Sequence, residues 1–296
     1  MMGEQFVQYI FSGVTMGSIY AIVAIGFNII YNATGILNFS QGEFVMLGGM
    51  IAFSFCRIMP ILPAVLLAVA ITALIGAVIE MIFIRWLRSP SVLRMIVITI
   101  GLSIIIRESA LHVWDEQVRA LPFFTGSEVS SVEILGAHVS PQVFWVLGIT
   151  ALIVAGLYVF FKFTVTGQLM RACADNRNAA SLCGVNTRNI VTLAFMLSAA
   201  IGALAGSVIS PLTQTHYGMG TPLAIKGFIV AILGGLGNSM AAVLAGLLLG
   251  LIEAFTVSVM PMAYTDVIAI AILLLILFFR PGGLFGNIEA GALREF

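Results

Sequence analysis

The side chains that could do chemistry in this sequence stand inside or beside long apolar runs. An ionisable group at the centre of a lipid bilayer costs about 2.5–3.5 kcal/mol on insertion scales, so it must face protein or water. A glycine-interrupted polar segment at that depth also needs partners for its backbone, because lipid offers none. The residues that meet these conditions are candidates for lining or gating a polar path, and they are Asn38, Gln41, Glu43, Lys226 and Glu253.

For the ionisable candidates the sequence leaves a structural alternative open. Glu43 could stand at the membrane interface and stabilise the N-terminal end of a second helix. Lys226 could extend to the outer interface, or contact a substrate carboxylate in an exterior vestibule. Glu253 is the most central carboxylate, and we expect it to face the bundle interior as a hydrogen-bond partner between helices or as a path residue.

The remaining charges near the ends of apolar runs are expected at the interface or in local pairs. Glu80 lies near Arg85 at the inner end of one run, and Arg107 and Glu108 are neighbours in the outer half of the next. Interfacial placement or local pairing explains both sets. Asp266, near the outer end of the last run, is also expected at the interface.

We find no constellation for catalysis or for a metal ion. His112, His138 and His216 fall in predicted exterior loops or at their edges, without the spacing of metal ligands. The 3 cysteines form no metal-spaced cluster, and their odd number indicates reduced thiols. We therefore predict that the chain is no enzyme and binds no cofactor or metal itself.

A second polar segment, GQLMRACADNRNAASLCGVNTRN from Gly167 to Asn189, is short, cationic and rich in small residues. Asp175 or Asn176 can cap a helix over Arg177–Cys183, and Gly184 stands where a left-handed residue ends a helix. Another short helix is predicted over about 168–174. The segment is either a pair of interfacial helices that meets a cytoplasmic partner or a solvated connector, and spacing alone does not decide.

Composition places these residues in a membrane protein. Hydrophobic residues make up 60% of the 296 residues and charged residues 9%, with a mean hydropathy of +1.12. Soluble domains carry about 25% charged residues, so this chain cannot cover a soluble surface. The formal net charge is zero, and no basic face indicates nucleic acid. The first apolar run lacks a basic leader and a small-residue cleavage site, which favours a retained span.

We predict an all-α, polytopic bundle of about 8–9 transmembrane helices that forms one domain over residues 1–296. A region over 223–259 is too long for one ordinary span, and LGGLGNS (Leu233 to Ser239) divides it at a glycine turn. The spacings Gly13–Gly17, Gly202–Gly206 and Gly246–Gly250 suggest closely packed helices. The predicted spans are 6–30, 43–59, 61–84, 94–113, 142–162, 190–212, 223–237, 239–259 and 263–279.

Basic residues predict the orientation, because they gather on the cytoplasmic side. They occupy the connection between the third and fourth spans and the loop over about 163–189, and they follow the last span. The loop over about 113–141 is mainly acidic and is predicted to be exterior, with the N-terminus outside and the C-terminus in the cytoplasm. The residues behind this assignment are Arg85, Arg88, Arg94, Lys162, Arg171, Arg177, Arg188, Arg280 and Arg294, against Asp115, Glu116, Glu128 and Glu133.

Four motifs in order resemble the branched-chain amino acid permease family of ABC importers over nearly the whole chain. SGVTMGSIYAIVAIGFNIIYNATGILNFSQGEFVMLGG resembles the family's amino-terminal signature, and GQLMRACADNRNAASLCGVNT resembles its coupling segment. KGFIVAILGGLGNSMAAVLAGLLLG and the terminal RPGGLFG complete the order. Ser40 and Gln41 depart from the usual pattern, which leaves the substrate open among branched-chain and other neutral amino acids, amides and urea-like solutes.

The resemblance implies a permease subunit in a bacterial inner membrane that takes work from a separate ATPase. Its partners would be a homologous second permease subunit, two cytoplasmic ATPase subunits that bind the ATP, an exterior solute-binding protein and membrane lipid. The sequence lacks the phosphate-loop motif of an ATPase. The residues that would couple to the ATPase are Arg171, Ala172, Asp175, Asn176, Ala179, Leu182 and Gly184.

Two other functions remain as alternatives at this point. A secondary transporter or channel for a small polar solute would use Glu43 and Glu253 to carry protons or cations, but would leave the segment 167–189 without a role. A scaffolding membrane subunit with no path would tolerate polar substitutions at Asn38, Gln41 or Glu43.

Overall fold

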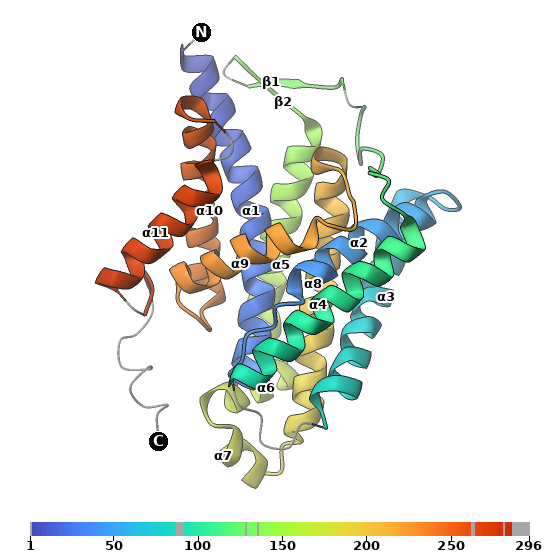
Figure 1. The fold of residues 1–296 in the computed structure, drawn as a ribbon, viewed down its shortest axis with the longest axis vertical. Helices are drawn as coiled ribbons and strands as arrows, with labels where there is room; N and C mark the ends of the chain where they lie inside the picture. The colour runs from blue at the N-terminus through green and yellow to red at the C-terminus, as the bar shows by residue number, and fades with distance from the viewer. Residues whose placement is uncertain are drawn as a thin grey trace.

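The computed structural model describes residues 2–86, 92–127, 129–134, 136–261, 264–280 and 282–285. In these ranges the protein is a bundle of helices with one small hairpin (Figure 1). Six helices are long and apolar enough to cross a membrane. They are α1 (Met2–Thr34), α3 (Ile61–Ile79) continued by the π-helix η1 (Glu80–Ile84), α4 (Val92–Trp114), α5 (Pro141–Phe163), α8 (Thr187–Thr213) and α10 (Ser239–Val259).

Three further apolar helices are shorter than a bilayer span. These are α2 (Gln41–Cys56), α9 (Gly220–Gly234) and α11 (Thr265–Phe279), with 16, 15 and 15 residues. Each predicted apolar run contains one helix, so the polytopic helical fold is confirmed. The number of spans is not settled by length, because a complete span needs about 20 residues.

The two ends of the bundle carry different segments. At one end, β1 (Val132–Ile134) and β2 (Ala137–Val139) pair in an antiparallel hairpin beside the start of α1. Gln8 Nε2 donates to the His138 carbonyl oxygen at 3.2 Å across this contact. The sequence did not predict strands in the loop over about 113–141, because three-residue strands are too short to show an alternating pattern.

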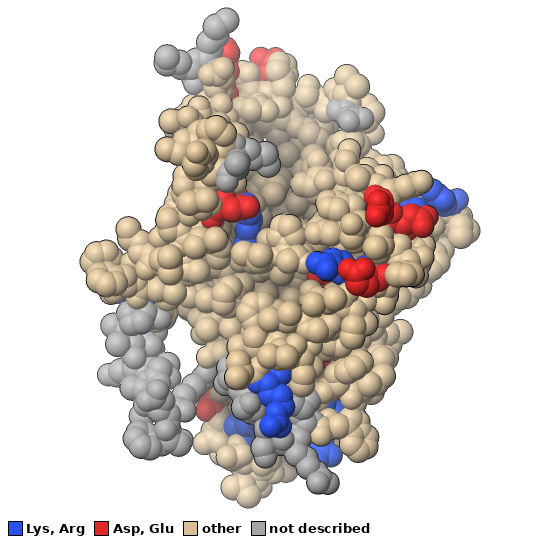
Figure 2. Space-filling model, in the orientation of Figure 1, with Lys and Arg blue, Asp and Glu red and all other residues tan. Residues whose placement is uncertain are grey.

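The opposite end carries α6 (Val165–Asp175) and α7 (Arg177–Leu182) (Figure 1). Arg85 Nη2 donates to Asn189 Oδ1 at 3.4 Å, so two of the predicted cytoplasmic segments lie together. Lys and Arg side chains gather at this end in Figure 2. Arg88, Glu128 and Arg294, which entered the orientation argument, lie outside the described residues.

Glycines bring the helices into backbone contact, as their spacing predicted. The glycines Gly13 and Gly17 of α1 face Gly246 and Gly250 of α10. A Cβ at Gly17 would stand 2.6 Å from the Gly246 carbonyl oxygen. A Cβ at Gly206 on α8 would overlap the Val45 carbonyl oxygen on α2. Such contacts give close van der Waals packing where lipid offers no hydrophobic driving force.

The predicted division of 223–259 is confirmed. Gly235 and Gly237 have φ of 102° and 90°, a backbone conformation that favours glycine, and they separate α9 from α10. Asn28 Oδ1 accepts from Gly237 N at 3.0 Å, and Asn32 Nδ2 donates to the Gly237 oxygen at 2.9 Å. The end of α1 therefore holds this turn in place.

Candidate functional site

The two short helices α2 and α9 begin against each other inside the protein. A Cβ at Gly42 would overlap the Gly220 carbonyl oxygen, so the N-terminal turns touch through glycine. Helix N-termini carry partial positive charge, equivalent to about half an elementary charge each. Two such ends in contact favour a negative group between them. That group is the side chain of Glu43, which lies in the first turn of α2.

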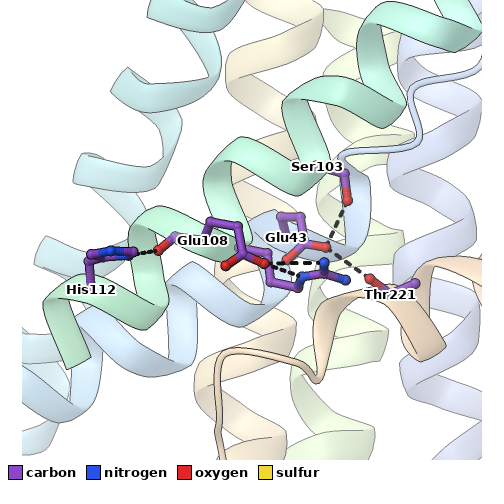
Figure 3. Close-up of polar contacts among 6 residues, drawn as sticks. Glu43, Ser103, Glu108, His112 and Thr221 are labelled. Atoms are coloured by element: carbon purple, nitrogen blue, oxygen red, sulfur yellow. Dashed lines mark hydrogen bonds and ion pairs between the residues drawn. The ribbon is translucent and has the colours of Figure 1, made fainter. Parts of the chain in front are cut away.

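The Glu43 carboxylate joins three helices. Its Oε1 accepts from Ser103 Oγ on α4 at 2.9 Å and from Thr221 Oγ1 on α9 at 3.3 Å (Figure 3). Its Oε2 is buried with no hydrogen-bond partner in the described part of the chain. Glu43 is 1% exposed and lies in the first turn of α2, so it is placed to stabilise that N-terminal end, and its depth in the membrane stays a prediction. The segment before α2 carries it into the interior.

Asn38 and Gln41 fix the backbone where α2 begins. Asn38 Oδ1 accepts from Ser40 N at 3.2 Å and from Ser40 Oγ at 2.6 Å, which shapes the turn before the helix. Gln41 Nε2 donates to the Ser198 carbonyl oxygen at 3.3 Å, and its Oε1 accepts from Ser198 Oγ. Both residues are buried. These contacts show a packing role, and a path role for them stays a prediction.

A second polar cluster joins α1, α9, α10 and α11. Lys226 Nζ lies 2.9 Å from Glu253 Oε1 and 3.1 Å from Asp266 Oδ1. Tyr20 Oη donates to Glu253 Oε2 at 2.8 Å. The Lys226 side chain is 17% exposed, whereas that of Asp266 is 72% exposed. The cluster is therefore buried toward Glu253 and open toward Asp266.

This cluster corrects one expectation and confirms another. Lys226 does not extend alone to the outer interface, because two carboxylates hold its ammonium group in the protein. Glu253 faces the bundle interior as a partner between helices, as predicted. Sequence reasoning missed Tyr20, Ser103 and Thr221, since a single hydroxyl in an apolar helix gives no sign of a distant carboxylate partner.

The remaining charged candidates are Arg107 with Glu108 on α4, and Glu80 at the end of α3. Arg107 and Glu108 form a local ion pair at 3.3 Å, as predicted, and His112 Nδ1 lies 2.8 Å from the Glu108 carbonyl oxygen (Figure 3). Glu80 is buried and accepts from Thr192 Oγ1 at 2.6 Å, so its partner is a hydroxyl on α8, and its depth in the membrane stays a prediction. It begins the π-helix η1, whose wider turn carries the chain onto α8.

The segment 167–189 folds as two short helices, as predicted. Asn176 caps α7, since its Oδ1 accepts from Ala179 N at 2.9 Å. Gly184 has φ of 86° and follows the end of α7, and Val185 N donates to the Ala180 carbonyl oxygen at 3.1 Å. This is the 6→1 bond of a glycine-terminated helix. Asp175 is the last residue of α6, and Asn176 supplies the cap.

One face of α6 and α7 packs on the bundle and the other is open. Met170, Cys173 and Ala180 are buried, whereas Leu182 is 89% exposed. The exposed side of the segment, Leu182 included, is therefore available for contact with a partner. The predicted coupling residues are all exposed, namely Arg171, Ala172, Asp175, Asn176, Ala179, Leu182 and Gly184.

Comparison with known sequences identifies the family. Residues 9–277 match the family described as branched-chain amino acid transport system / permease component. The chain belongs to this family. It is 33% identical to the high-affinity branched-chain amino acid transport system permease protein BraD of Pseudomonas aeruginosa, over 96% of this chain and 97% of that protein. It is also 33% identical to LivH of Escherichia coli, a permease protein of the same description, over 97% and 99%.

The permease fold is also found in a solved structure. PsaBC from Streptococcus pneumoniae in complex with Fab gives a TM-score of 0.50 at 12% identity, covering 97% of this chain and 95% of that chain. At this identity the likeness concerns the fold alone. The family match places the two polar clusters and the α6–α7 segment within one membrane permease component.

The Glu43→Gln variant separates a charge role from a packing role. Glutamine keeps an oxygen for Ser103 and Thr221, so we expect the permease to fold and ATP-driven uptake to stay within about threefold of wild type. Glu43→Leu should lose assembled protein, because both hydroxyls lose their acceptor. Uptake in proteoliposomes with ATP and an uncoupler provides the measurement. A proton carrier at Glu43 would instead lose uptake in the Gln variant and with the uncoupler.

Proposed function

We propose that this permease component is the membrane subunit of an ATP-driven importer for branched-chain or other neutral amino acids. The observation that carries the proposal is the open surface of α6 and α7 at the basic end of the bundle, with Leu182 at its tip. BraD and LivH, which are branched-chain amino acid transport permease proteins, support the substrate class. Because the sequence holds no phosphate-loop motif, the ATP would bind to separate subunits.

The packing of α6 gives a route for mechanical coupling. Leu182 and its exposed neighbours would enter a groove on an ATPase subunit, and closure of two ATPase subunits would displace the segment. On its buried side α6 packs on α1, α5 and α8. Helices α1 and α8 in turn enclose Gln41 at the start of α2. A displacement of α6 would therefore reach the two short helices and alternate access to the exterior and the cytoplasm.

A second permease subunit would cover the face formed by α4, α9 and α11. Charged side chains stand near mid-height on this face in Figure 2. Arg107 and Glu108 on α4 are 34% and 46% exposed, although α4 is apolar enough to span. Lipid solvates such groups poorly, so a protein partner or an enclosed aqueous path would have to do so. The solute path would run between the two permease subunits along this face.

The two ends of the helical bundle would face opposite sides of the membrane and meet different partners. An exterior solute-binding protein would dock at the end that carries the hairpin and the start of α1. The α6–α7 end would face the cytoplasm, as would the C-terminus, in a bacterial inner membrane. The basic residues of the α6–α7 end support this orientation.

The coupling role is tested at Gly184, which has a left-handed backbone conformation. Valine is strained at such φ, whereas asparagine tolerates it. We expect Gly184→Val to lower ATP-driven uptake at least about tenfold while the ATPase subunits keep basal hydrolysis. Gly184→Asn is the matched control and should keep coupling. Equal uptake by both variants in reconstituted complexes would remove the support for this role.

The orientation is tested with the native cysteines. Cys183 is exposed at the end of α7, whereas Cys173 is buried in α6. Burial raises the pKa of the Cys173 thiol, although Arg177 partly opposes this, so less thiolate forms near neutral pH. In a Cys56→Ser background, a membrane-impermeant maleimide should label Cys183 in inside-out vesicles, with protection when the ATPase subunits bind. Labelling of Cys183 in right-side-out vesicles would show that α7 faces the exterior and would contradict the proposed orientation.

A further inference from the structure

A cavity of about 250 Å³ lies between α1, α5, α6 and the turn before α10. Its volume falls just below the roughly 300–1,000 Å³ of drug-sized ligand sites, so it fits a small metabolite. Most of its wall is apolar, with Ile29, Val154, Leu157 and Phe161 among the lining residues. This cavity lies apart from the Glu43 and Lys226 clusters, and it shares Arg171 with the predicted coupling residues.

Polar groups converge on the cavity from three elements. Arg171, a cationic residue of α6, lines it. Ser239 and Met240 line it from the first turn of α10, where Asn238 Oδ1 already accepts from Ala241 N at 3.0 Å. The earliest N–H groups of a helix have no partner within the helix itself. Asn32 lines it from α1, and its Nδ2 donates to the Gly237 oxygen, which leaves its Oδ1 available as an acceptor.

These groups match the three parts of an aliphatic amino acid. The guanidinium and the α10 N-terminus favour a carboxylate. The Asn32 Oδ1 can accept from an ammonium group. The apolar wall suits a branched side chain, and burial of each methylene contributes about 0.8 kcal/mol.

We propose that this cavity binds a neutral aliphatic amino acid from the cytoplasm and that the bound molecule slows further import. This inference rests on the proposed orientation and function, in which α6 moves with the ATPase. A ligand between Arg171 on α6 and the start of α10 ties α6 to the bundle. It binds best to the conformation in which the cavity is formed, so it shifts the population away from other positions of α6. Accumulated product thereby opposes its own uptake.

The binding test uses radiolabelled leucine and the purified transporter in lipid nanodiscs without the solute-binding protein. We expect saturable binding that weakens at least about tenfold in Val154→Phe, which fills the cavity, and in Arg171→Gln, which removes the cation. Leu152→Phe is the matched control, because Leu152 lies on the same helix and is exposed. Unchanged binding in both cavity variants would overturn the proposal.

An anionic phospholipid could offer the same chemistry, with a phosphate in place of the carboxylate. Nanodiscs of purely zwitterionic lipid and nanodiscs with anionic lipid are therefore compared. Equal leucine binding in both supports the amino acid site. Occupation by lipid alone, with no leucine binding in either disc, overturns it.

The functional test measures ATP hydrolysis stimulated by leucine-loaded binding protein, with free leucine then raised to millimolar levels. We expect wild type and Leu152→Phe to slow severalfold, and Val154→Phe to stay fast. Lack of any stimulation at low leucine would contradict the proposed importer, whereas stimulation that free leucine never slows would contradict only the cavity inference. The two failures are thus distinguishable.

Discussion

Replacement of Lys226 by methionine is expected to destabilise the permease by about 3–5 kcal/mol, the usual cost of removing one partner from a buried ion pair. Methionine keeps much of the apolar length of the lysine side chain but leaves Glu253 without its cation. Tyr20 still donates to the other carboxylate oxygen, which is not enough to balance a buried negative charge. Thermal unfolding of the purified protein in detergent should show a clearly lower Tm.

Two companion variants show whether the buried pair is responsible. Asp266→Asn should change the Tm less, because the Asp266 side chain is 72% exposed and the buried Glu253 keeps its ion pair with Lys226. Combining Lys226→Met with Glu253→Gln should recover much of the loss, since a neutral amide oxygen still accepts from Tyr20. If Asp266→Asn lowers the Tm as much as Lys226→Met, the buried ion pair between Lys226 and Glu253 is not the main source of stability in this cluster.

The second large effect is expected at the contact of α2 with α8. Gly206→Ala would place a methyl group onto the Val45 carbonyl oxygen, so the two helices must separate. Overpacking a close contact typically costs about 1–3 kcal/mol, and a backbone oxygen is less able to move than a side chain. We expect reduced yield of folded permease and a lower Tm. Size-exclusion profiles and thermal unfolding measure both.

Gly156→Ala is the matched control for this substitution. Gly156 lies within α5, and a Cβ there would meet no atom within 4 Å in the described structure. Alanine is favoured over glycine in helices by about 1 kcal/mol, so this variant should be neutral or slightly stabilising. A similar loss in both variants would mean that helix contact is not the cause.

Local chemistry in the sequence was enough to predict several features. The glycine turn after α9 and the Asn176 and Gly184 boundaries of α7 depend on residues next to each other in the chain. Their caps and left-handed positions follow from neighbouring residue types alone. The helical type of each apolar run was predicted from its length and composition.

The partners of the buried charges could not be predicted. Ser103 and Thr221 reach Glu43 from helices that meet it only in the folded bundle. Likewise, Tyr20 and Glu253 are 233 residues apart in sequence. Apolar periodicity gives no register between distant helices, and lipid-facing and protein-facing surfaces are equally apolar. That is why the sequence did not show which helices bury Glu43 and Glu80.

The contact between the starts of α2 and α9 has a consequence for biogenesis. Thr221 follows Glu43 by 178 residues, so the ribosome delivers it roughly 10–35 s later at ordinary synthesis speeds. Until Thr221 is made, the nascent chain holds a Glu43 side chain that lacks at least one of its two hydroxyl donors. A chaperone, a lipid headgroup or translocon water must shelter it meanwhile, and any polypeptide cut short before α9 would present this exposed anion to quality-control proteases.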